Sequence, residues 1–313
     1  MVRLILRRLA WSVPLLVVAT MLAFLIVDLI PGDPARVILG PTATAEQVEA
    51  LRVSLGLDRP WFVQYLAWLG DALRGDLGTS VISKTPVIDQ LNARLPATLS
   101  IVVGATVVSA VLGVALGVFS AVRGGWAGRA ADVFAMLGFA IPNYWLGLVL
   151  VAVVAVQLRW LPATGYTPLT ESPWEWLKAL ILPVITLAVG GVTMIAKNTR
   201  EALRDVLARD FIDSLRADGW SESRILVRHA LRNAGIPIVT AIGVFFVGVL
   251  GGTVLVESVF AIPGLGGLAV AATPAHDLPV LLGVTVYFCT LVVIVNLLVD
   301  VTYGVLNPKV RAA

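Results

Sequence analysis

The chain of 313 residues contains one cysteine, two histidines and four lysines, and each scarcity excludes a class of site. Cys289 has no second cysteine, so neither a disulfide framework nor a cysteine-ligated metal cluster can form. None of the lysines follows a glycine, so the Gly-Lys pair of a phosphate-binding P-loop is missing. A step driven by nucleotide hydrolysis therefore needs a second polypeptide that binds the nucleotide.

Hydrolytic and metal motifs are equally scarce. No HExxH or GxSxG pattern occurs, which disfavours an intramembrane hydrolase, and we assign no catalytic residue. Asp277 follows His276 in a stretch that we expect to be an exposed loop. One histidine beside one carboxylate is a weak basis for a metal or proton site, so we assign no metal ligand.

Charged residues make up only 14% of the chain, whereas hydrophobic residues make up 58% and mean hydropathy is +0.91. These values exclude an ordinary soluble globule, and the net charge of +3 gives no indication of a nucleic-acid partner. Apolar runs of about 20 residues cross a bilayer as helices, and the runs here do not alternate as barrel strands do. We predict an all-α, polytopic helical membrane protein with six transmembrane helices, at 9–30, 97–122, 132–158, 179–197, 236–260 and 279–303.

Lysine and arginine predict the orientation of these spans, because basic residues are enriched in cytoplasmic loops. With the N-terminus in the cytoplasm, 15 of the 23 basic residues lie inside and 8 lie outside. Both termini are therefore predicted to be cytoplasmic. The first apolar run is too long for the apolar part of a signal peptide, and we expect it to be a retained helix.

The predicted spans divide the chain into four parts. We expect an N-terminal tail with the first helix (1–30), an extracytoplasmic segment (31–96), a five-helix permease core (97–303) and a cytoplasmic tail (304–313). The core contains a cytoplasmic loop (198–235). In the outer segment, Thr44 and Gln47 have the spacing of a capping box, which predicts a helix that ends before Gly56.

The loop 198–235 has a pattern of its own. Leucine or phenylalanine recurs at every fourth residue from 203 to 215, which predicts one amphipathic helix. Gly219 is expected to end that helix, Ser221 to cap a second short helix, and Pro237 to mark the start of the fifth span. Two interpretations of such a loop have equal weight. In the first, it docks to a cytoplasmic partner; in the second, it is a solvated loop that lies on lipid headgroups.

Polar and aromatic residues within the spans are candidates for lining a translocation path, because intramembrane polar groups are costly and often functional. Asn143, Tyr144 and Trp145 follow Pro142, where the third span is expected to kink, and Glu257 lies in the fifth span. For Tyr144 and Trp145 the alternative is packing against a neighbouring helix. For Glu257 it is a structural hydrogen bond between helices.

A set of motifs extends along nearly the whole chain. The loop sequence Asp210-Phe-Ile-Asp-Ser-Leu-Arg-Ala-Asp-Gly219, followed by His229-Ala-Leu-Arg-Asn-Ala234, resembles the EAA loop of the dipeptide and oligopeptide permeases. These permeases are transmembrane subunits of ATP-binding-cassette (ABC) importers. Further matching stretches, in family order, are Pro31-Gly-Asp-Pro-Ala35, Gly75-Asp-Leu-Gly-Thr-Ser80, Ile141-Pro-Asn-Tyr-Trp145, Glu257-Ser-Val-Phe260, Pro263-Gly-Leu-Gly266 and Asn296-Leu-Leu-Val-Asp300.

Two stretches of the loop depart from the family pattern. Asp213-Ser-Leu215 stands where the general EAA pattern begins with Glu-Ala-Ala. Ala217-Asp-Gly219 stands where the family commonly has Ala-Lys-Gly, which replaces a cation with an anion. The glycine itself is kept.

The resemblance implies a type I ABC importer permease fold in the inner (cytoplasmic) membrane, surrounded by lipid. It implies three kinds of protein partner: a second homologous permease, two ATP-binding-cassette ATPases and an extracytoplasmic substrate-binding protein. ATP and Mg are then bound by the ATPases, and this chain holds no cofactor. The residues implied to couple to the ATPase are Asp213, Ser214, Leu215, Arg216, Ala217, Asp218 and Gly219.

The resemblance also implies the transport of di- or oligopeptides delivered by the binding protein. Permeases of this type also serve nickel and other small solutes, which is the main alternative. The scarcity of histidine and methionine in the spans favours peptides. An ion channel or an intramembrane enzyme fits less well, because we find neither an internal repeat nor paired reactive residues.

Overall fold

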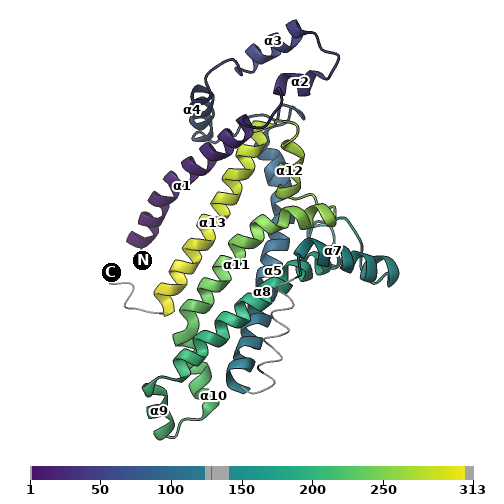
Figure 1. Ribbon diagram of the computed structural model, residues 1–313. Helices are drawn as coiled ribbons and strands as arrows, with labels where there is room; N and C mark the ends of the chain where they lie inside the picture. The colour runs from purple at the N-terminus through teal and green to yellow at the C-terminus, as the bar shows by residue number, and fades with distance from the viewer. Residues whose placement is uncertain (1, 124–127, 129–140, 307–313) are drawn as a thin grey trace. The chain divides into compact units, whose positions relative to one another are not determined.

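The computed structural model describes residues 2–123, 128 and 141–306, and every regular element within them is a helix (Figure 1). An isolated antiparallel bridge joins Thr79 to Pro86. The chain divides into two compact units. We call residues 6–98 and 263–293 the N-terminal unit, and residues 1–5, 99–262 and 294–313 the core unit.

Five helices of the described residues are long and apolar enough to cross a membrane, which confirms an all-α polytopic chain. Each carries one of the predicted spans. They are Ile5–Val27, Val87–Arg123, Pro173–Leu207, Glu222–Val259 and Leu278–Leu306.

The remaining predicted span, 132–158, lies partly outside the described residues. In its described part, the helix α7 (Asn143–Leu150) continues into a π-helix, η1 (Val151–Gln157). Pro142 precedes α7 as its N-cap, with φ −62° and ψ 131°. The part of the span before Ile141 lies outside the described residues, so the kink at Pro142 stays a prediction. In the described part the proline stands at the start of a helix, where its missing N–H costs no hydrogen bond.

In the N-terminal unit, α4 (Trp61–Ala72) is held to α1 (Val2–Asp28) by Tyr65. The Tyr65 hydroxyl donates to the carbonyl oxygen of Val17 at 2.9 Å and shares a hydrogen bond of 3.0 Å with the hydroxyl of Thr20. Its ring meets Phe24 edge to face, with 5.8 Å between centroids. Because the tyrosine hydroxyl is buried, these polar contacts decide where along α1 the helix α4 binds.

Two short helices, α2 (Pro34–Leu39) and α3 (Ala45–Ser54), precede α4. The predicted capping box at the start of α3 is confirmed: the Thr44 side chain accepts from Gln47 N, and the Gln47 side chain accepts from Thr44 N. Gly56 follows the end of α3 with φ +68°, the left-handed conformation in which glycine commonly ends a helix.

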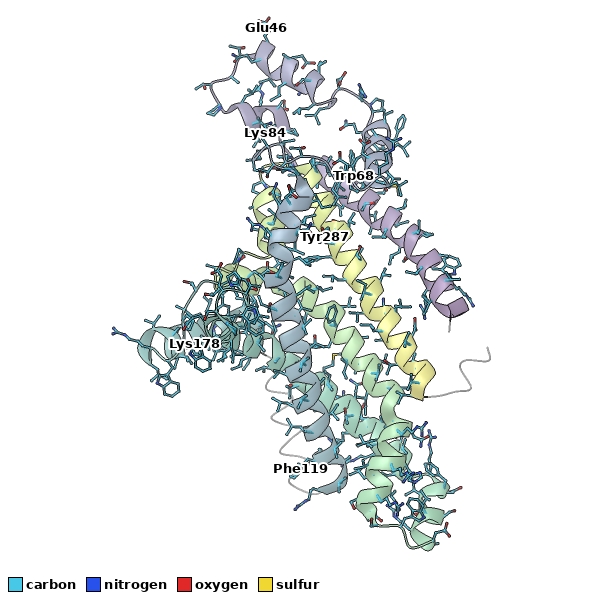
Figure 2. All side chains as sticks on the ribbon, turned by 180° about the vertical axis from the view of Figure 1, so that it is seen from behind. Glu46, Trp68, Lys84, Phe119, Lys178 and Tyr287 are labelled. Carbon is cyan, nitrogen blue, oxygen red and sulfur yellow. The ribbon has the colours of Figure 1, made fainter. Side chains whose placement is uncertain are left out.

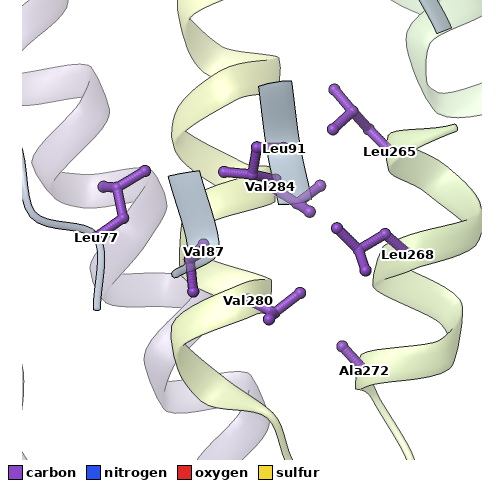
Figure 3. Packing of buried hydrophobic residues seen from close by; sticks show 8 residues of the cluster. All are labelled: Leu77, Val87, Leu91, Leu265, Leu268, Ala272, Val280 and Val284. Atoms are coloured by element: carbon purple, nitrogen blue, oxygen red, sulfur yellow. The ribbon is translucent and has the colours of Figure 1, made fainter. Parts of the chain in front are cut away.

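The hydrophobic core of the N-terminal unit lies between the start of α5 (Val87–Arg123), α12 (Leu265–Ala272) and the start of α13 (Leu278–Leu306) (Figure 3). A methyl group on Gly283 of α13 would come within 2.6 Å of the Val87 side chain, so the glycine permits this close packing. The buried members of the cluster are Leu77, Val87, Leu91, Leu265, Leu268, Ala272, Val280 and Val284.

The pair His276 and Asp277 is buried, contrary to the exposed loop that we expected. The Asp277 carboxylate accepts hydrogen bonds from the Ser80 hydroxyl and from Val81 N, which joins residues almost 200 positions apart. Its oxygens therefore anchor the segment before α5 to the loop before α13. Among the described residues, no group of three His, Cys, Asp or Glu side chains is placed to hold a metal ion.

Replacing Ser80 with alanine is expected to destabilise the N-terminal unit by about 1–3 kcal/mol, because a buried carboxylate oxygen loses its hydroxyl donor. Thermal unfolding of the purified protein measures the effect. Ser54→Ala is the matched control, since the Ser54 hydroxyl donates only to a carbonyl of its own exposed turn. Equal unfolding temperatures for the two variants would show that the Ser80–Asp277 contact does not anchor the unit.

In the core unit, α5 packs against α8 (Pro173–Leu207) through small residues. A methyl group on Gly117 would lie 2.6 Å from the carbonyl oxygen of Ala196, and one on Gly113 would lie 2.8 Å from Ile195. The Ser109 hydroxyl donates to the carbonyl oxygen of Ala188 at 3.2 Å. Small residues at such positions let membrane helices approach closely, so that backbone atoms come into contact.

Candidate functional site

The best candidate site is an exposed segment of the core unit, residues 210–222, which we call the α9 segment. It consists of the eight-residue helix α9 (Asp210–Ala217) and the turn that leads to α10 (Glu222–Arg224). In Figure 1 it lies where α8 ends and where α10, the π-helix η2 (Ile225–Ala230) and α11 (Leu231–Val259) begin.

A hydrophobic cluster joins the end of α8 to η2 and to the start of α11, the elements that flank the α9 segment in the chain. It is formed mainly by Leu203 and Val206 of α8 and by Ala230, Ala234 and Ile238 across from them. This packing holds together the two helical ends between which the α9 segment is connected. A displacement of α9 is therefore expected to move the helices that carry it.

The predicted helix from 203 to 215 is in fact two helices. Leu203 lies in α8, which ends at Leu207, and α9 begins only at Asp210. The four-residue spacing gave the wrong prediction because α9 does not bury the predicted stripe. Phe211, which belongs to the stripe, is 37% exposed, whereas its neighbour Ile212 is fully buried. Pro237 also lies inside α11 rather than at its start, because one continuous helical path runs from Glu222 to Val259.

Gly219 ends α9 as predicted. It has φ +78°, and its N–H donates to Arg216 O at 3.0 Å, while Trp220 N–H donates to Leu215 O at 3.1 Å. These two bonds are those of a Schellman motif, in which a left-handed residue reverses the chain. Ser221 occupies the predicted N-cap position of the next helix, but its side chain makes no capping hydrogen bond.

Arg216 joins the two sides of this turn. Its guanidinium donates to the Glu222 carboxylate at 2.8 and 3.3 Å and to Asp213 at 2.9 Å. The hydrogen bonds to Glu222, and then those to Asp213, raise the pKa of Arg216. In return, the bonds from Arg216 hold the pKa of Glu222 below its usual value. Two carboxylates thus share one cation at the surface of the α9 segment.

Trp220 is a residue of the segment that sequence reasoning missed. Its ring lies 4.3 Å from the Arg224 guanidinium carbon, a cation–π contact, and meets His229 edge to face at 5.1 Å. It therefore fixes the angle at which the turn leaves α10 and η2. A large aromatic residue directly after a helix-ending glycine was the available signal, because that position often makes a hydrophobic contact.

The structure brings the seven predicted coupling residues together on one short helix and its turn. Leu215 is half-buried and the others are exposed. Asp213 lies in the first turn of α9 and Arg216 in the last, which suits the helix dipole at both ends. The charged side chains of Asp213, Arg216 and Asp218 are thus exposed on a short helix and its turn.

Glu222→Gln is expected to loosen the α9 segment at neutral pH, since the Arg216 bridge needs the ionised carboxylate. Because the pKa of Glu222 is lowered in the folded protein, its ionised carboxylate stabilises the segment at every pH above about 4.3, the usual pKa of a glutamate. This stabilisation is lost as the pH falls through the lowered pKa. Amide hydrogen exchange in residues 213–222 should thus be about twofold faster than in the wild type at pH 7, and equal to it once the wild type is protonated.

The matched control for this prediction is Glu201→Gln, which removes an exposed carboxylate from α8 outside the segment. Its exchange in residues 213–222 should equal that of the wild type at every pH. If Glu222→Gln behaved like this control, the ion pair with Arg216 would have no part in holding the turn.

The predicted path residues separate into two groups. Asn143, Tyr144 and Trp145 are exposed at the start of α7; Tyr144 and Trp145 are 48% and 52% exposed. Glu257, in contrast, is 1% exposed inside α11. The helices themselves pack together, because Gly147 of α7 lies against Phe260, which follows α11.

The helical fold matches solved structures of one class. An inward-facing structure of the MetNI methionine ABC transporter gives a TM-score of 0.58 at 20% identity, covering 70% of this chain and 97% of that one. The fold is therefore that of a type I ABC importer permease.

The chain belongs to the binding-protein-dependent transport system inner membrane component family, which matches residues 113–312. The N-terminal family of the same transport systems matches residues 1–102. A Sinorhizobium fredii protein named a probable peptide ABC transporter permease is 41% identical over 98% of both chains. A glutathione transport system permease of Escherichia coli is 38% identical over 99% of both. The protein is thus a multi-pass transport permease, with ATPase and substrate-binding partners.

Proposed function

We propose that this chain is one of two permease subunits of an ABC importer that carries di- or oligopeptides into the cell. Relatives named as peptide and glutathione permeases match it over nearly their whole length, which supports a peptide substrate. The observation that carries the proposal is the exposed α9 segment, mounted on two long membrane helices and turned by Gly219.

The proposed importer contains a second, homologous permease, two ATPase subunits and an extracytoplasmic binding protein. ATP and Mg bind to the ATPases, and this chain supplies neither a cofactor site nor a catalytic group. In the proposed orientation, both termini and the α9 segment face the cytoplasm. Residues 31–96 face outward, where the binding protein delivers its peptide.

Energy reaches this chain through the α9 segment. When ATP binding closes the two ATPases, the groove in which α9 sits moves, and α8 and α11 follow because their ends are packed together beneath it. The permease pair then exchanges an inward-facing arrangement for an outward-facing one, a rigid-body change of the kind known for domain switches. Gly219 and Arg216 keep α9 at a fixed angle during this movement.

Asn143, Tyr144 and Trp145 are the residues proposed to contact the passing peptide. Their exposure on this chain leaves them available to a path that the second permease completes. Glu257 is buried within the chain, which suits a supporting role behind the path better than contact with the solute. The Asn143 amide can form hydrogen bonds with the peptide backbone, and the rings of Tyr144 and Trp145 can pack against its side chains.

Uptake by reconstituted vesicles tests the function. The transporter, purified with the subunits that accompany this chain, is expected to import labelled dipeptide only when the binding protein, ATP and Mg are all present. Import of nickel complexes without competition from peptides would favour the small-solute alternative. Uphill transport by this chain alone would contradict a permease that depends on a separate ATPase.

The proposed orientation has its own test, because Cys289 is the single native cysteine. In a Cys289→Ser background, Ser54→Cys and Ser214→Cys place exposed thiols on α3 and α9. A membrane-impermeant maleimide applied to intact spheroplasts is expected to label residue 54 and to reach residue 214 only after permeabilisation. The reverse result would invert the proposed topology.

A further inference from the structure

The N-terminal unit contains a hollow of about 510 Å³, within the range of about 300–1,000 Å³ that is usual for ligand pockets. Its walls come from the end of α1, from α2 and the end of α3, from α4 and from the start of α13. The lining is mostly apolar and includes Phe24, Val27, Trp68 (Figure 2), Leu278 and Leu282. Phe24 and Leu282 are buried and form its apolar floor.

Two of the charged groups at the hollow neutralise each other. The Asp33 carboxylate lies 2.7 Å from the Arg52 guanidinium, and it also caps α2 by accepting from Ala35 N at 3.0 Å. Arg52 makes a second ion pair, of 3.1 Å, with Glu49. The Arg52 charge is thus matched by two carboxylates and is not free to attract a ligand.

Arg59, which also lines the hollow, differs from Arg52. Its side chain is exposed, and its guanidinium makes no hydrogen bond or ion pair with any residue that the structure describes. Its Cδ and Nε atoms would lie 3.8 Å from a methyl group on Gly56, so the side chain folds back over the turn that ends α3. The hollow therefore has an apolar floor and one unpaired cation at its edge.

The depth of this site in the membrane follows from the helices that line it. Val27 is the last residue of the first apolar span and Leu278 the first residue of another. Phe24 and Leu282 lie about one turn further into these spans. In the proposed orientation, these span ends reach the extracytoplasmic face. The floor then lies at the level of the outer acyl chains, and Arg59 at the level of the headgroups.

We propose that this hollow binds an anionic phospholipid of the outer leaflet, with an acyl chain on the apolar floor and the phosphate at Arg59. The inference goes beyond peptide transport and rests on the proposed orientation alone. A free phosphate ion would leave the apolar hollow filled with water, whereas an acyl chain fills the hollow and the lipid phosphate pairs the cation. The bound lipid attaches the outer segment to the membrane surface.

Lipid retention by the purified transporter, with its accompanying subunits, tests the proposal. Native mass spectrometry compares phosphatidylglycerol with phosphatidylethanolamine of identical acyl chains, and with inorganic phosphate. Arg59→Gln is expected to weaken phosphatidylglycerol retention about fivefold, the factor that one basic residue contributes near an anionic membrane. Retention of phosphatidylethanolamine, whose ammonium group offsets the charge of its phosphate, should fall less than that of phosphatidylglycerol. The control is Arg74→Gln, which removes an exposed arginine that does not line the hollow.

A second variant, Ala67→Phe, fills the hollow from α4 and is expected to reduce retention of both lipids. Its unfolding temperature must match the wild type, so that lost binding is not lost folding. Wild-type retention of phosphatidylglycerol by both Arg59→Gln and Ala67→Phe would overturn the proposal. The proposal would also be overturned if inorganic phosphate bound as tightly as the lipid. It would likewise be overturned if Arg59→Gln and Ala67→Phe weakened the capture of the binding protein but not the retention of lipid. The measurement needs no transport, so it is independent of the proposed function.

Discussion

Gly219→Val is expected to lower ATP-driven uptake by the assembled importer at least about tenfold while leaving substrate capture by the binding protein unchanged. Gly219 has φ +78°, and a left-handed backbone costs a side-chain-bearing residue about 1–2 kcal/mol, with β-branched residues least tolerated. No atom lies within 4 Å of a methyl group at this position, so the substitution strains the turn without disturbing the packing of the helices. The Schellman bonds that aim α9 are therefore lost first.

The matched control for Gly219→Val is Gly75→Val. Gly75 also has a positive φ, +90°, and also has open space where a methyl group would stand, but it lies in the N-terminal unit. It carries similar backbone strain without touching the α9 segment, so the ATPases should remain coupled to the chain, and any loss of uptake should appear as weaker substrate capture instead. Normal uptake by Gly219→Val, with intact ATPase assembly, would remove the proposed coupling role.

Gly117→Ala is expected to destabilise the core unit. The added methyl group would lie 2.6 Å from the Ala196 carbonyl oxygen and 2.6 Å from the Thr199 Cβ atom. A backbone oxygen inside a helix cannot move aside as a flexible side chain does, so α5 and α8 must separate. Overpacking of this kind typically costs about 1–3 kcal/mol, and a lower unfolding temperature in detergent or nanodiscs measures it.

Gly248→Ala provides the comparison for Gly117→Ala, because both glycines lie inside long membrane helices. No atom lies within 4 Å of a methyl group at Gly248, so alanine there should leave stability unchanged or raise it by about 0.5–1 kcal/mol. Equal unfolding temperatures for the two variants would mean that α5 and α8 do not meet as closely as the structure places them.

Local chemistry made several elements predictable. The capping box of Thr44 and Gln47 and the terminating glycine at Gly56 give the bounds of α3, because all their hydrogen bonds join residues only a few positions apart. The end of α9 at Gly219 is of the same kind. The long apolar runs predicted the five described membrane helices, because a lipid-embedded backbone must satisfy its own hydrogen bonds.

Errors arose where a local pattern had two outcomes. Apolar residues spaced four apart from 203 to 215 suggested one helix. In the structure, α8 ends at Leu207 and a separate helix, α9, buries Ile212. Pro237 suggested a helix start, yet the packed ends of α8 and α11 hold a helix through it. In both cases contacts with distant residues outweighed the local preference.

The sequence alone determined that the chain is helical, crosses the membrane repeatedly and carries an exposed helix–glycine turn, because apolar length and glycine placement are properties of neighbouring residues. Only the tertiary structure decided that Asp277 is buried against Ser80, that Trp220 contacts both Arg224 and His229, and that Arg59 lies at the edge of an apolar hollow. Except for those of Trp220, these contacts join residues that are far apart in the sequence and meet only when the chain folds. Their energy depends on burial and exact position, which residue type and spacing do not encode.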